Sequence, residues 1–173
     1  MLIRFVIAGI SSLMILTSAF AQSDAVKNAS REEIEGYWQL VALPDQVEPK
    51  LLPTNPWPAE CQWFAYGSNG QLKSIDKLRG PCEEQSKAQL EQVFNAVPAV
   101  VSWEYDMSPV CHKAVLIIKR SDVKGYGEVW EPQIVVKPFT NGGVTFQTGD
   151  LLLYLADMHA HKMVWIRHLR KIN

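Results

Sequence analysis

A strict alternation of apolar and polar residues in the second half of the chain constrains the fold more than any other feature. Between Val101 and Met107 the apolar side chains occupy the odd positions and the polar ones the even positions. Such a period of two is typical of a β-strand with one buried face. Further extended runs follow at 113–120, 128–137, 144–148, 151–156 and 162–171. The sequence therefore predicts a mostly β fold.

The first half of the chain adds three expected strands and one helix. The strands are expected at 34–43, 60–66 and 71–75, and a turn with glycine at both ends, Gly67-Ser68-Asn69-Gly70, joins the last two. From Pro81 to Val97, apolar residues recur at spacings of three and four, which predicts a helix. The segment 44–58 contains five prolines, so an irregular loop is expected there.

The order and number of these strands favour a closed sheet. Eight or nine antiparallel strands joined by short connections predict an up-and-down barrel, because closure removes both exposed sheet edges. Two strands, 114–118 and 151–155, are apolar on both faces and need a cover outside the barrel. The helix is expected to pack over one of them, and a homodimer contact is one use for the other.

The N-terminal segment is expected to be a secretory signal peptide covering residues 1–21. Arg4 supplies a positive charge, an apolar run extends from Phe5 to Phe20, and Ala19-Phe20-Ala21 resembles a cleavage site. An uncleaved anchor is the alternative, but the run is shorter than the ~20 residues that span a bilayer. We expect a flexible leader at 22–33, a barrel domain at 34–173, and a periplasmic or secreted protein.

Composition excludes several functional classes. The chain has 173 residues, 47% of them hydrophobic, and a net charge of −1. It is too apolar for a disordered segment, and it lacks the excess of positive charge that nucleic-acid binding requires. No nucleophile elbow, phosphate loop, zinc-protease motif or dinucleotide fingerprint is present. We therefore expect a protein that is not an enzyme and that carries no cofactor.

The sequence contains three cysteines, Cys61, Cys82 and Cys111, which an oxidising compartment would tend to pair. Cys61 and Cys82 flank the first hairpin, and a bridge between them would stabilise the fold by about 3 kcal/mol. We take this pair as the expected disulfide, although pairing of Cys111 with either of the others remains open at the level of sequence.

Metal binding is not expected. His159 and His161 are separated by one residue, so both side chains can reach one metal ion from an extended backbone. Two ligands alone bind weakly, and the remaining histidines lie elsewhere in the chain. A polar turn is the simpler interpretation of this segment.

The start of the first expected strand resembles a known family. Gly36-Tyr37-Trp38 is similar to the Gly-x-Trp opening of lipocalins and the wider calycin group, and it follows a short leader. The resemblance implies that Trp38 closes one end of the barrel and that a basic residue of the last strand packs across it. Arg167 and Arg170 are the candidates for that residue. A cation over an indole ring contributes ~0.5–2 kcal/mol.

Six aromatic residues are the candidates for lining the interior of the barrel. An eight-stranded barrel is just wide enough to be filled by side chains or to hold one small ligand. A hollow barrel would make the protein a carrier of a small apolar molecule. A filled one would favour a protein-binding module, such as a periplasmic inhibitor or assembly accessory. The six residues are Trp38, Trp63, Trp103, Tyr105, Trp130 and Trp165.

Overall fold

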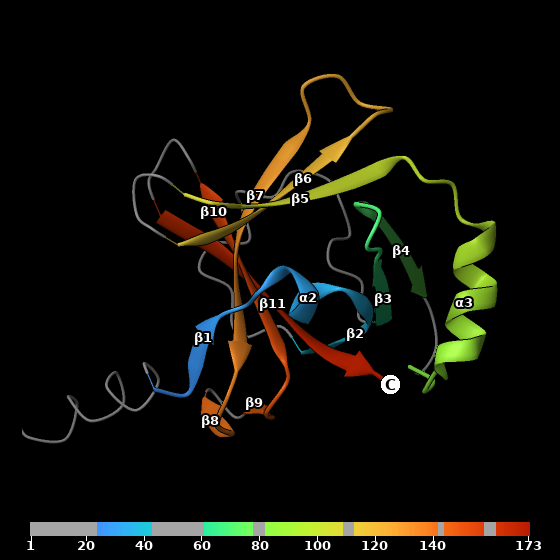
Figure 1. Ribbon diagram of the computed structural model, residues 1–173. Helices are drawn as coiled ribbons and strands as arrows, with labels where there is room; N and C mark the ends of the chain where they lie inside the picture. The colour runs from blue at the N-terminus through green and yellow to red at the C-terminus, as the bar shows by residue number, and fades with distance from the viewer. Residues whose placement is uncertain (1–23, 43–60, 78–81, 109–112, 142–143, 158–161) are drawn as a thin grey trace, which may run out of the picture.

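The computed structural model describes residues 24–42, 61–77, 82–108, 113–141, 144–157 and 162–173 (Figure 1). Eight long strands dominate it: β2 (Gly36–Ala42), β3 (Cys61–Tyr66), β4 (Gln71–Lys77), β5 (Val101–Met107), β6 (Ala114–Arg120), β7 (Gly127–Val135), β10 (Leu151–Asp157) and β11 (Lys162–Ile172). The remaining described elements are the strands β1 (Val26–Asn28), β8 (Phe139–Asn141) and β9 (Val144–Phe146) and the helices α2 (Arg31–Ile34) and α3 (Lys87–Ala96).

The eight long strands form a closed antiparallel barrel. Each pairs with the next along the chain, β11 pairs back onto β2, and β6 pairs with β7 to complete the circle. The predicted mostly β class and the up-and-down barrel are therefore confirmed. β1 is an additional strand that pairs with the C-terminal half of β7.

The interior of the barrel is a packed core. Alternate residues of each strand point inward, as the pleat of a strand requires, and β2 contributes Trp38 and Leu40 while β11 contributes Trp165 and Leu169. Most of these side chains are almost completely buried. Large aromatic and branched side chains thus occupy much of the space that a carrier would leave open.

The residues just before β2 seal the floor of the barrel. β1 binds to the edge of β7, and Ala29 and Ile34 are fully buried. A capping box starts α2, in which the Ser30 side chain accepts a hydrogen bond from the backbone of Glu33. The expectation of a flexible leader at 22–33 is therefore wrong from residue 24 onward, because these residues pair with β7 and pack into the core.

Helix α3 lies against the outer face of the barrel beside β4 (Figure 1). It is shorter than the predicted helix, because Ser86 caps its first turn together with Gln89. Its buried residues, Leu90 and Phe94, pack with Cys61 and other residues of the β2–β4 wall. The expected placement over 114–118 or 151–155 is therefore wrong.

The hairpin of β8 and β9 covers a different part of the outer wall. Phe139 and Phe146 stack with ring centroids 4.6 Å apart, and Phe146 packs with the buried Leu152 of β10. The expected strand at 144–148 is thus not part of the barrel wall. The hairpin covers the outward-facing apolar side chains of β10. The sequence had indicated the helix as a cover for this strand or for 114–118.

Candidate functional site

Five of the six predicted aromatic residues belong to the interior of the barrel, and one does not. Trp38, Trp103, Trp130 and Trp165 are buried in the main core, and Tyr105 packs against it. The sixth residue, Trp63, is buried on the outer face of the barrel beneath α3. The expectation that Trp63 lines the interior is wrong, because it lies between two inward-facing positions of β3.

A lysine, which the sequence analysis did not nominate, lies over Trp38. The Lys171 ammonium is 5.1 Å from the centre of the indole ring, and the two residues are directly paired between β11 and β2. The indole Nε1 donates a hydrogen bond to the carbonyl of Ile34 at 2.7 Å. Trp38 is therefore buried beside the segment that precedes β2, and the basic residue that packs on it is Lys171.

The two arginines expected at the floor have other surroundings. The Arg167 guanidinium lies 4.5 Å from the ring centre of Trp130 and 4.7 Å from that of Phe64, inside the barrel. Arg170 is on the outward side of β11, where it donates two hydrogen bonds of 3.0 Å to Asp150. Their assignment to Trp38 is corrected, because the strand register places Lys171 opposite that indole.

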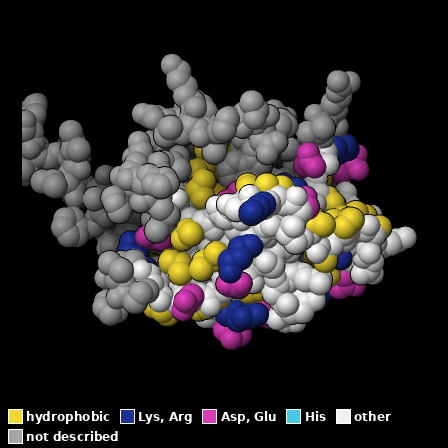
Figure 2. Space-filling view, turned by 90° about the horizontal axis from the view of Figure 1, so that it is seen from above, with side chains coloured by type: hydrophobic (Ala, Val, Ile, Leu, Met, Phe, Trp, Pro, Cys, Tyr) yellow, Lys and Arg dark blue, Asp and Glu magenta, His cyan; other side chains and the backbone are white. Residues whose placement is uncertain are grey.

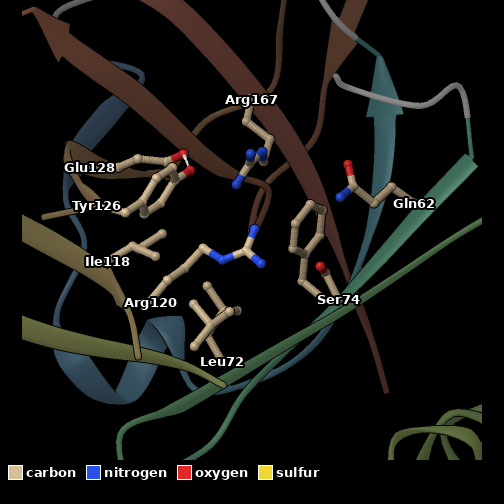
Figure 3. A pocket seen from close by; sticks show the side chains of 10 residues that line it. Gln62, Leu72, Ser74, Ile118, Arg120, Tyr126, Glu128 and Arg167 are labelled. Atoms are coloured by element: carbon tan, nitrogen blue, oxygen red, sulfur yellow. Dashed lines mark hydrogen bonds between the residues drawn. The ribbon is translucent and has the colours of Figure 1, made fainter. Parts of the chain in front are cut away.

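A cavity of about 170 Å³ lies in the barrel around Arg167 (Figure 3). One part of its wall is apolar, from Phe64, Leu72 and neighbouring strand residues. The rest is polar, with groups contributed by β3, β4, β6, β7 and β11. The lining residues are Gln62, Phe64, Leu72, Ser74, Val101, Ile118, Arg120, Tyr126, Glu128 and Arg167.

The cavity lies toward the end of the barrel away from the sealed floor. Gln62 is near the start of β3, whereas Tyr66, at its other end, packs edge-on against Trp103. The indole Nε1 of Trp103 donates to the carbonyl of Gly67 in the turn that follows β3. The floor of the barrel interior is therefore filled by aromatic side chains, and the cavity around Arg167 lies nearer the opposite end.

Arg167 gives this cavity a buried positive charge. Only 3% of the residue is exposed. Burial lowers the pKa of Arg167, while Tyr66 and Glu128 act in the opposite direction. A guanidinium nevertheless stays protonated at neutral pH because its ordinary pKa is so high. Burial likewise raises the pKa of Tyr66 to about 12, so its hydroxyl remains neutral.

Arg120 places a second guanidinium in the lining, at the end of β6. It donates two hydrogen bonds to Asp122, of 2.9 and 2.7 Å, and lies 5.7 Å from the ring centre of Tyr126. Both partners of the ion pair are more than a third exposed. Exposed ion pairs contribute little to stability, so Arg120 can turn from Asp122 to another anion at low cost.

Glu128 is the one carboxylate in the lining, and it is already engaged. Its Oε2 accepts a hydrogen bond of 2.9 Å from Trp130 Nε1, and its Oε1 accepts one from the Tyr126 hydroxyl. Desolvation, followed by the contact with Glu128, raises the pKa of Tyr126 above its ordinary value. The lining thus holds two guanidinium groups and one carboxylate, and an anionic ligand that displaces Asp122 from Arg120 would meet both arginines.

A second polar cluster lies outside the barrel wall, beneath the β8–β9 hairpin. His168 Nε2 and Asp150 Oδ2 are 2.6 Å apart, and both residues are buried. Burial raises the pKa of Asp150, but hydrogen bonds with His168 and Arg170 outweigh this and lower it to about 2. Phe146 stacks on the His168 ring at 4.5 Å. This cluster attaches the hairpin to the barrel and lines no described cavity.

The cysteine and histidine residues singled out in the sequence lie partly within and partly outside the described residues. Cys61 and Cys82 form the expected disulfide, with Cα atoms 5.3 Å apart. Cys111, His159 and His161 lie outside the described residues. Within the described ranges, no cluster of three or more histidine, cysteine or acidic side chains has the arrangement of a metal site.

Five polar residues of the cavity were not nominated from the sequence: Gln62, Ser74, Arg120, Tyr126 and Glu128. Gln62 and Ser74 occupy inward positions of β3 and β4, and Arg120 ends an apolar strand. Polar residues at positions where the pleat points inward are the signal that identifies such groups. In β3 that signal is weak, because apolar residues occupy both faces of the strand.

Comparison with known proteins identifies no relative: no family model, no curated protein and no solved structure matches the chain. None of the helices in the described segments is both long and apolar enough to cross a membrane. On the face shown in Figure 2, basic side chains lie beside acidic ones, and hydrophobic side chains form separate groups.

Proposed function

We propose that this protein is a secreted, lipocalin-like binding protein without catalytic activity, and that its ligand is a small molecule with one anionic group and a short apolar body. The observation that carries the proposal is the cavity itself. It combines two guanidinium groups, from Arg120 and Arg167, with an apolar wall that includes Phe64, Leu72 and Ile118. Such a combination of apolar surface and a few charged groups is typical of ligand sites.

The volume of the cavity favours a small ligand. A cavity of about 150 Å³ in another protein holds one benzene molecule, and the cavity here measures about 170 Å³. The proposed ligand is therefore about the size of an aromatic monocarboxylate. It differs from the apolar ligand expected from the sequence, because a molecule without charge would remove water from two guanidinium groups without replacing it.

The disulfide and the barrel support the other parts of this proposal. The Cys61–Cys82 bridge is of a kind that persists in oxidising compartments, which fits secretion or export to the periplasm. The closed antiparallel barrel with Trp38 at its floor is consistent with a calycin-like protein. Membership of the lipocalins in particular rests on the Gly36-Tyr37-Trp38 opening.

Isothermal titration calorimetry with benzoate and benzamide tests the anionic ligand. The two molecules have nearly the same shape, but only benzoate is charged, so we expect benzoate to bind more tightly. Its affinity should fall as salt is added, since salt screens the attraction. Equal affinity for the two, or no binding of either, would contradict the proposal.

Variants of two arginines at opposite ends of the barrel locate the interaction. Arg120→Gln should weaken benzoate binding about tenfold, the usual scale for a hydrogen bond to a charged group. Arg31→Gln is the matched control, because Arg31 lies over Trp103 near the floor, 4.9 Å from the centre of its ring. Benzoate affinity should be unchanged in this control, and an equal loss in both variants would contradict binding in the cavity.

A protein-binding module is a second candidate, favoured by how much of the barrel interior is filled by side chains. Such a protein would use its surface and would need no ligand in the cavity. Light scattering of the purified protein at micromolar concentration tests the simplest case, in which the partner is a second copy. A dimer mass would favour this candidate, and a monomer mass would count against it.

A further inference from the structure

Gln62 is a buried polar residue whose side-chain oxygen lacks a hydrogen-bond partner. Only 7% of the residue is exposed, and within the described part of the chain its Oε1 atom has no hydrogen-bond partner. Buried amide groups are nearly always paired in folded proteins, because an unpaired one loses its hydrogen bonds to water without replacing them. Gln62 also lines the cavity, and a turn of its carboxamide would bring Oε1 to a molecule bound there, which would supply the missing hydrogen bond.

The carboxamide faces the arginines from across the cavity. Figure 3 shows Gln62 and Ser74 on one side, and Arg120 and Arg167 with their neighbours on the other. Gln62 and Ser74 belong to β3 and β4, whereas the arginines belong to β6 and β11. The cavity therefore presents a neutral polar group at one side and positive charge at the other, with apolar surface on its walls.

We propose that the ligand is a small hydroxy acid, and that Gln62 determines specificity by binding its hydroxyl group. This inference rests on the proposed function, because it assigns the anionic end of the ligand to Arg120 and Arg167. A hydroxyl group both donates and accepts hydrogen bonds, so it pairs with either the oxygen or the nitrogen of the carboxamide. An apolar group in the same place would leave Oε1 of Gln62 buried and unpaired.

A pair of ligands with matched shape tests the role of Gln62. 4-Hydroxybenzoate and 4-methylbenzoate are similar in size and carry the same carboxylate, but only the first has a hydroxyl group. By isothermal titration calorimetry, the wild-type protein should bind 4-hydroxybenzoate about tenfold more tightly, the scale expected when a buried polar group is otherwise left unpaired. Equal binding of the two acids would overturn the proposal.

Variants of two glutamines assign the preference to one side chain. Gln62→Leu should abolish the preference for the hydroxy acid. Gln92→Leu should retain it in full, because Gln92 lies on the exposed face of α3. Loss of the preference in both variants, or in neither, would contradict the role assigned to Gln62.

A spectroscopic measurement covers the case in which Gln62→Leu does not fold. In wild-type protein labelled with ¹⁵N, 4-hydroxybenzoate should shift the side-chain amide resonances of Gln62, and 4-methylbenzoate should shift them much less. Equal shifts with both acids would overturn the proposal.

The outcomes also separate this inference from the proposed function. If both acids bind equally and Arg120→Gln weakens both, the anionic ligand stands and the hydroxyl does not. If neither acid binds, both proposals fall.

Discussion

Trp38 is fixed at the barrel floor by a hydrogen bond and by a cation. Its indole Nε1 donates to the carbonyl of Ile34, and the Lys171 ammonium lies over the ring. Lys171 also donates to the carbonyl of Glu33, so β11, β2 and α2 meet at Lys171. The identity of Trp38 therefore contributes to the stability of the whole floor.

Replacing Trp38 by phenylalanine should lower the free energy of unfolding by about 2–3 kcal/mol. The change leaves the Ile34 carbonyl without its donor and opens a cavity in the core. Trp63→Phe is the matched control, because Trp63 is equally well buried but its Nε1 has no hydrogen-bond partner in the described structure. Urea denaturation measures both variants, and equal losses would contradict the importance of the hydrogen bond.

Asp150 should make stability depend on pH in the acid range. Its pKa is about 2 in the folded protein, compared with an ordinary value of 3.8. The charged carboxylate therefore stabilises the fold fully above the ordinary value, and this contribution is lost as the pH falls from about 4 toward 2. Urea denaturation at a series of pH values should show a loss of about 2 kcal/mol over this window.

The Asp150→Asn variant assigns this pH dependence to one residue. It should lack the loss between pH 4 and pH 2 and be less stable than the wild type at neutral pH. Asp122→Asn is the control, because Asp122 forms an exposed ion pair with Arg120 and such pairs contribute little. An unchanged pH profile in Asp150→Asn would contradict the role of the cluster with His168 and Arg170.

The alternation of apolar and polar residues predicts which side chains point into the barrel only in strands that have one apolar face and one polar face. In β5 the pattern is strict, and Trp103 is in the interior as predicted. In β3 almost every residue is buried on one face or the other, so the sequence does not show which way Trp63 points. The position of Lys171 over Trp38 depends on strand register, which a single sequence does not specify.

At the scale of elements, α3 acts as a cover for one part of the barrel wall. Leu90 and Phe94 are buried against residues of β2, β3 and β4, and Phe94 stacks on Tyr37 with ring centroids 5.9 Å apart. The disulfide joins β3 to the segment that precedes the helix. These contacts lie on the outer face of the wall, so α3 supports the barrel without contributing to the cavity.

Replacing Leu90 by alanine should therefore destabilise the protein without changing its site. The loss should be about 3 kcal/mol, because the side chain is fully buried. Val93→Ala is the control on the same helix, since Val93 is 43% exposed and should cost far less. Thermal denaturation measures stability and calorimetry measures benzoate affinity. A large loss of affinity in folded Leu90→Ala would contradict the separation of helix and site.

Local sequence signals account for the boundaries of the helices better than apolar spacing does. Ser86 and Gln89 form a capping box that starts α3 at Lys87, whereas the predicted helix begins at Pro81. Ser30 and Glu33 form another, which starts α2 within the supposed leader. Polar residues at 22–33 suggest mobility, but a capping box and a buried alanine show how a short polar segment becomes part of a fold.

At the scale of the whole molecule, one barrel combines a filled floor with a small charged cavity. The number and order of the strands favour closure of the sheet, and the sequence predicts all eight wall strands, although it also predicts a ninth at 144–148 that is not in the wall. The size of the cavity does not, because it depends on how far the aromatic side chains fill the interior. The same residues that suggest a ligand pocket, such as Trp38 and Trp165, form the packed core instead.

The most direct test of this account is a calorimetric titration of the protein with benzoate and, separately, with the long-chain fatty acid palmitate. The cavity measures about 170 Å³, which accommodates a benzene-sized group but not a long alkyl chain. Both ligands carry a carboxylate, so the comparison isolates size. The account predicts that benzoate binds at one site and that palmitate does not bind. Tighter binding of palmitate than of benzoate would contradict a barrel whose interior is mostly filled.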